Sequence, residues 1–73
     1  MIKMKREEMI KELKEMELIK FYIMRCNQEI EDENQEGYYQ VWNALVGAVQ
    51  MYLIIKKSND TNACAFVREL LEK

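Results

Sequence analysis

The first half of the chain carries one continuous apolar stripe at helical spacing. The steps between its members are three, four or seven residues: Ile2, Met9, Leu13, Met16, Ile19, Ile23, Cys26 and Ile30. Side chains spaced in this way fall on one face of a helix with about 3.6 residues per turn. Leu18, Phe21 and Tyr22 widen the stripe near its middle. The pattern predicts one long helix over about residues 5–34.

A second, more apolar helix is predicted over about residues 38–57. Its polar positions form only a narrow stripe, at Gln40, Asn43, Gly47, Gln50 and Lys57. The apolar positions make several faces, of which one holds Tyr38, Val41, Trp42, Leu45, Val49 and Tyr52 and another holds Ala44, Ala48, Met51 and Ile55. A helix that is apolar around about two-thirds of its circumference has to be covered on most sides.

Two polar segments separate the predicted helices. Gly37 is the expected stop signal of the first helix, because glycine tolerates the left-handed conformation that often ends a helix. We therefore expect the first turn within residues 34–38. In the second segment, residues 58–62, Asn59 or Asp60 is the expected N-cap of a short helix over about residues 61–72. The fold class is all-α, a three-helix hairpin or bundle in one domain over residues 1–73.

The size of the chain indicates self-association. A domain of 73 residues buries only about 60% of its unfolded surface, and one long and one short helix cannot cover the whole apolar arc of the central helix. We expect a homo-oligomer, most simply a two-fold dimer, in which Ala44, Gly47 and Ala48 permit close helix approach. The predicted interface residues are Tyr38, Trp42, Leu45, Ala48, Val49, Tyr52, Ile55, Met9 and Met16.

An acidic segment precedes the central helix and holds Glu31, Asp32, Glu33 and Glu36. Read from Asp32, it matches the first half of a calcium-binding EF-hand loop, with Gly37 at the invariant glycine position. The second half does not match, because position twelve of the loop, which needs a bidentate acid, is Asn43. The sequence predicts no metal site here, but a charged turn that faces a basic partner protein.

The remaining chemistry is sparse. The chain has no histidine, and Cys26 and Cys64 are its only strong nucleophiles, in apolar surroundings without an activating group. We therefore expect neither an enzyme nor a cofactor or zinc site. A net charge of −2 and a pI of about 5.1 disfavour nucleic-acid binding. The longest apolar run, residues 44–55, falls short of the about 20 residues of a membrane span.

These features favour a small cytoplasmic regulator or inhibitor that acts by binding a partner protein. The bias toward Lys, Glu, Ile and Asn, with no Pro, suggests a bacterial or phage origin. Two alternatives stay open. An oligomer that encloses pockets between subunits would bind a nucleotide-like ligand by stacking on Tyr and Trp, and a small DNA-associated transcriptional regulator would bind DNA with a strong dependence on salt.

Overall fold

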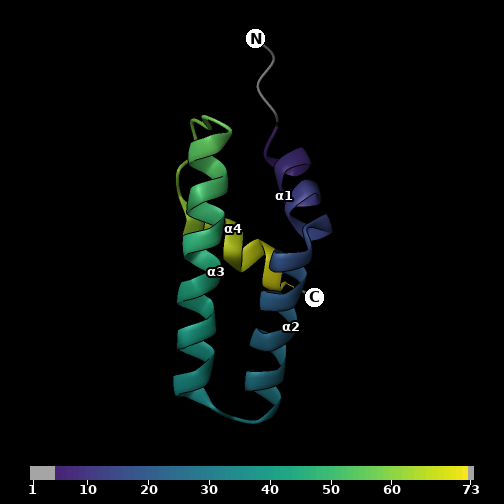
Figure 1. Ribbon diagram of the computed structural model, residues 1–73, viewed down its shortest axis with the longest axis vertical. Helices are drawn as coiled ribbons and strands as arrows, with labels where there is room; N and C mark the ends of the chain where they lie inside the picture. Colours follow the sequence, from purple (N-terminus) through teal and green to yellow (C-terminus); the bar gives the residue numbers. More distant parts are fainter. Residues whose placement is uncertain (1–4, 73) are drawn as a thin grey trace.

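The computed structural model describes residues 5–72, which form four helices and no strand (Figure 1). The helices are α1 (Arg6–Glu15), α2 (Glu17–Glu31), α3 (Gln35–Ile55) and α4 (Ala63–Leu71). The predicted all-α class is confirmed. Four helices replace the three that were predicted, because the expected long helix is broken in two.

The break lies at Met16, whose backbone is extended, with φ −77° and ψ 129°. The backbone hydrogen bonds of α1 end here and those of α2 begin. The Met16 N–H donates to the Leu13 carbonyl at 3.1 Å, and the Lys20 N–H donates to the Met16 carbonyl at 2.9 Å. No Gly or Pro is present to force the break. Packing causes it, because the turn at Met16 lets α1 bury Ile10 as well as Leu13 against the core. Ile2, the first member of the predicted stripe, lies outside the described residues.

Polar contacts hold α1 in its bent position. The Arg6 guanidinium bonds Glu69 through Nε at 3.0 Å and Asp60 through Nη1 at 2.7 Å, and it also stacks on the Phe66 ring, 4.1 Å from its centroid. On the other side, Glu12 of α1 bonds Lys56 beyond α3 at 3.1 Å. Such partly exposed ion pairs contribute about 0–1 kcal/mol each, so they orient α1 while burial supplies most of the stability.

The turn between α2 and α3 falls earlier than predicted. Glu33 takes the left-handed conformation, with φ 55°. Asn34 caps α3, because its side chain accepts a hydrogen bond from the Gly37 N–H at 3.1 Å. Gly37 therefore lies inside the first turn of α3, and its predicted role as the stop signal of the preceding helix is wrong. The asparagine cap begins the helix three residues before the predicted start.

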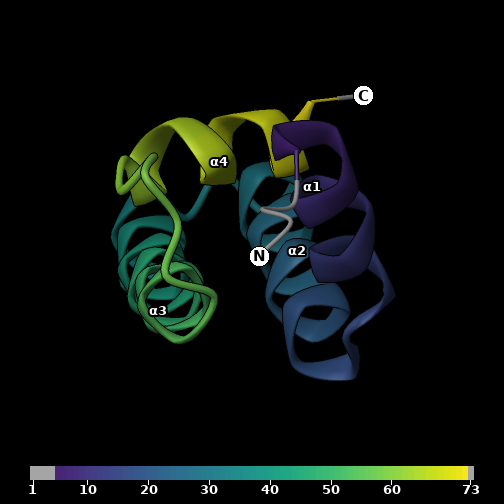
Figure 2. The ribbon, with the colours of Figure 1, turned by 90° about the horizontal axis from the view of Figure 1, so that it is seen from above.

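Helix α4 crosses one side of the antiparallel α2–α3 pair (Figure 2). Its N-cap is Asn62, which accepts a hydrogen bond from the Ala65 N–H at 3.1 Å, rather than Asn59 or Asp60. Asp60 has another role, since its side chain accepts the Asn62 N–H and also binds Arg6. The core lies between α4 and the other three helices, and its largest fully buried side chains are Phe66, Leu13, Ile19, Leu45, Leu53, Val49, Val67 and Cys26.

Candidate interaction surface

Four of the predicted interface residues lie inside the chain's own core. Met9 comes from α1, and Leu45, Val49 and Tyr52 come from α3, and all four are buried. The Tyr52 hydroxyl lies near the Glu12 carboxylate, but the two do not form a well-aligned hydrogen bond. Burial, and then the charge of the nearby Glu12 carboxylate, raises the pKa of Tyr52 to about 12. These side chains stabilise the single chain, so any contact with a second molecule has to use other residues.

The other predicted interface residues reach the surface to different degrees. Tyr38, Trp42 and Ala48 are half-buried along α3, whereas Met16 is exposed at the helix break. Ile55 is the most exposed large apolar side chain described. Thus Ile55 and Met16 remain open to a partner, while Tyr38, Trp42 and Ala48 pack in part against the core of the chain.

Four apolar residues on one face of α3 form a line, which we call the α3 stripe. It consists of Ala44, Ala48, Met51 and Ile55, at steps of four, three and four residues, which is the spacing of one helical face. Met51 is 59% exposed and Ile55 69%, and the neighbouring Ile54 is 60% exposed. Large apolar side chains gathered in this way, rather than scattered singly, mark a surface that contacts another molecule. The sequence pattern had separated this face of α3, although it did not single out Ile54.

The α3 stripe lies on the side of the helix pair that α4 leaves uncovered. Burial raises the pKa of both Tyr52 and Tyr38. The Glu12 carboxylate of α1 raises the pKa of Tyr52 further, and the Cys26 thiol of α2 does the same for Tyr38. These two tyrosines therefore mark the side of α3 that faces α1 and α2. Leu53 is buried about 100° beyond Tyr52 around the helix, and α4 is the remaining helix that packs on α3 (Figure 2). The stripe borders Tyr52 on the opposite side, away from α4.

Helix α2 contributes to the same side through Leu18. Ile23 and Asn27 of α2 line a cleft together with Leu70, so they face α4. Leu18 precedes Asn27 by nine residues, about two and a half turns, and therefore points to the opposite side of α2. Leu18 is exposed, as is Phe21 one turn later. We call Leu18 and the α3 stripe together the open face.

Two glycines on α3 differ in what surrounds them. A Cβ at Gly37 would clash with the carboxylate of Glu29, so the close approach of α2 explains that glycine. A Cβ at Gly47 would meet nothing within 4 Å. Glycine in a helix interior costs about 0.5–1 kcal/mol relative to alanine. The packing of the single chain therefore gives no reason for Gly47, which lies one residue before Ala48 of the stripe.

The acidic turn projects from the far end of the α2–α3 pair. Its four acids, Glu31, Asp32, Glu33 and Glu36, are exposed and make no ion pair with the described residues. Within the described part of the chain, no group of three or more Asp, Glu or Cys side chains is arranged to hold a metal ion. The turn is therefore a patch of unneutralised negative charge at one tip of the molecule.

Glu29, one turn before this patch, was not expected to differ from its acidic neighbours. It is only 7% exposed, and one carboxylate oxygen, Oε2, has no hydrogen-bond partner among the described residues. Its other oxygen accepts a long hydrogen bond of 3.4 Å from Arg25. The side chain points toward the first turn of α3, where the positive end of the helix dipole favours a carboxylate.

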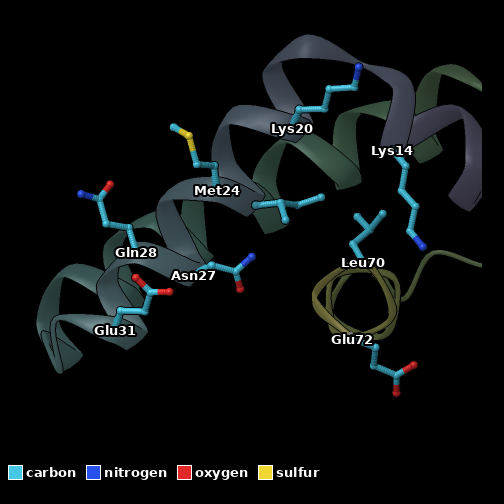
Figure 3. Close-up of a pocket in the computed structure, with 9 residues that line it drawn as sticks. Lys14, Lys20, Met24, Asn27, Gln28, Glu31, Leu70 and Glu72 are labelled. Atoms are coloured by element: carbon cyan, nitrogen blue, oxygen red, sulfur yellow. The ribbon is translucent and has the colours of Figure 1, made fainter.

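A cleft of about 740 Å³ lies between α2 and the end of α4 (Figure 3). Lys14 and Lys20 lie toward one end, and Leu70 and Met24 contribute apolar surface. The full lining is Lys14, Lys20, Ile23, Met24, Asn27, Gln28, Glu31, Leu70 and Glu72. None of the polar side chains that line it is buried. Ligand sites fix their ligand with a few well-placed polar groups in an enclosed pocket, and this cleft lacks that construction.

The two cysteines are free. Cys26 is fully buried, and burial raises the pKa of its thiol, which lowers the fraction of reactive thiolate. Cys64 is half-buried on α4.

Comparison with known protein families found no family model that matches the chain. Comparisons with curated proteins and with solved structures likewise found no match. In the described residues, none of the helices has both the length and the apolar character needed to cross a bilayer.

Proposed function

We propose that this chain is a self-associating helical module that acts by binding a partner protein, as a small regulator or inhibitor. The observation that carries the proposal is the open face, because its Leu18, Met51 and Ile55 are each more than half exposed, as is the neighbouring Ile54. Apolar surface left in water costs about 25 cal/mol per Å². A second copy of the chain removes this surface from water with no other component.

The proportions of the fold favour this arrangement. The chain measures 44 × 17 × 17 Å, so its long side presents an extended surface. A stable interface takes about 800 Å² from each partner. The α3 stripe alone runs over the 12 residues 44–55, about 16 Å from end to end at 1.5 Å per step, and Leu18 of α2 extends it sideways.

Self-association through the open face leaves the acidic turn free. The turn lies at one tip of the helix pair, where its four unpaired carboxylates would attract a basic surface on the partner protein. Charged surfaces of this kind accelerate encounter and select the partner. The module thus has two working parts: an apolar side that joins copies of the chain and an acidic tip that contacts the target.

Light scattering coupled to gel filtration tests the first part. We expect a mass of twice the 8.8 kDa chain that falls toward one chain mass on dilution. A single-chain mass at every concentration would refute self-association.

A tip variant, Glu31→Gln with Asp32→Asn and Glu33→Gln, tests the second part. We expect a bound partner to have a basic surface, to be released by salt, and to bind the tip variant weakly. Equal binding to wild type and tip variant would show that the acidic turn has no role in recognition.

A further inference from the structure

We infer that two copies pair through α3 in an antiparallel, two-fold arrangement centred at Gly47 and Ala48, with Gly47 at the point of closest approach. This inference rests on the proposed self-association and adds its register. The first support is the unexplained glycine. Gly47 occupies the interior of a 21-residue helix, and its missing side chain faces open space in the single chain. A backbone that approaches closely from outside is the remaining reason for glycine at such a position.

The distribution of side-chain sizes along α3 supports the same centre. On the α3 stripe the residue before the centre, Ala44, is small, and the centre itself holds Gly47 and Ala48. The half after it is large, with Met51 followed by Ile54 and Ile55. A two-fold axis requires that residue i contacts residue j of the partner while j contacts i.

An antiparallel pairing about this centre satisfies that requirement. Ala44 of one copy lies against Met51 of the partner copy, and Met51 lies against the partner's Ala44. Met51 of each copy then fills the space left by the partner's Ala44, as close packing requires. A parallel pairing would instead set large side chains against large ones and leave a gap between the small ones.

The charges at the two ends of α3 also favour antiparallel over parallel pairing. The N-terminal end of α3 adjoins the acidic turn, with Glu33 and Glu36, whereas Lys56 and Lys57 follow its C-terminal end. Lys56 is paired with Glu12, but Lys57 makes no ion pair with the described residues. Parallel copies would bring these like charges together at both ends, whereas antiparallel copies keep the like charges apart.

Disulfide trapping tests the register. In a Cys64→Ser background, Gly47→Cys is expected to form a covalent dimer on mild oxidation, because the two Gly47 positions meet near the axis. The fold tolerates this change, since a Cβ there meets nothing. The matched control is Gln50→Cys, an exposed position on the same helix. In this register the two copies of residue 50 lie five residues apart along the axis, about 7.5 Å at 1.5 Å per residue, so they should not cross-link. Cys26 stays in place because it is buried.

A cysteine at position 47 could itself disturb the contact, so a double-cysteine variant tests the register with Gly47 unchanged. Ala44→Cys combined with Met51→Cys leaves Gly47 intact and should link residue 44 of one copy to residue 51 of the other. If Gly47→Leu is made instead, we expect the dissociation constant to rise about tenfold or more, because overpacking at the axis separates the helices.

The outcomes separate the two proposals. A dimer by light scattering whose cysteine variants cross-link no better than the Gln50→Cys control overturns the register and leaves self-association standing. A single-chain mass at all concentrations overturns both. Cross-linking of Gly47→Cys and of the 44–51 pair, with the control unlinked, establishes the antiparallel arrangement.

Discussion

Substitution of Met51 by glutamate tests whether the open face is an interface. Met51 is the central large side chain of the α3 stripe and is 59% exposed in the single chain. An exposed helical position accepts glutamate at little cost to the fold, since glutamate is a good helix former. The substitution therefore acts on association and leaves the folded chain intact.

The size of the effect follows from the exposed fraction. Complete burial of a methionine side chain contributes about 2 kcal/mol, so covering the remaining 59% contributes about 1.2 kcal/mol per copy. A two-fold interface contains the residue twice, which gives about 2.4 kcal/mol, or about a 50-fold rise in the dissociation constant. Burying an unpaired carboxylate adds a further penalty, so this figure is a lower bound.

Sedimentation equilibrium over a dilution series measures the dissociation constant, and circular dichroism confirms that the helices persist. The control is Gln50→Glu, which adds the same charge one residue away, about 100° around the helix from the stripe. We expect the control to associate like the wild type. If the Met51→Glu chain dimerises as tightly as Gln50→Glu, the α3 stripe is not the contact surface and the reasoning from its exposure fails.

Three further predictions concern the fold of the chain. Phe66 is fully buried under Arg6, so Phe66→Ala should lower the free energy of unfolding by about 3–5 kcal/mol. Urea denaturation measures the loss. A change below about 1 kcal/mol would contradict the central place of Phe66 in the core. Arg6→Ala removes two ion pairs and the ring contact that fix α1. We expect the free energy of unfolding to fall by about 1 kcal/mol and backbone amide exchange in α1 to become faster. Unchanged amide exchange would mean that burial alone holds α1. Burial raises the Tyr52 pKa from 10.0 to about 12, so the folded chain keeps this proton longer than the unfolded chain. Its contribution is complete below pH 10 and is lost as pH rises toward 12, by about 2–3 kcal/mol in total. Tyr52→Phe should make the free energy of unfolding, measured by urea titration, fall less steeply with rising pH. The control Tyr39→Phe, at an exposed position, should not change this dependence. An equal dependence of stability on pH in the two variants would refute the assignment to Tyr52.

The local pattern of residues determined most of the secondary structure. Apolar spacing at three and four residues is a property of the chain alone. It predicted the all-α class and, to within three residues, all four helical boundaries that border the two polar segments. It also separated Ala44, Ala48, Met51 and Ile55 as a distinct face of the central helix. The acidic turn was placed between the correct helices, because charge and the absence of apolar residues are equally local.

Only the tertiary structure decided how the chain bends and which faces it covers. No residue near Met16 forbids a continuous helix, and the break exists because Ile10 and Leu13 gain burial when α1 turns toward α4. The burial of Glu29 likewise depends on the approach of Gly37 from another helix. Helix α3 carries several apolar faces of similar character, and its own sequence does not rank them. The side that α4 crosses becomes core and the opposite side stays exposed, because a short fourth helix can cover only one side of a helix pair.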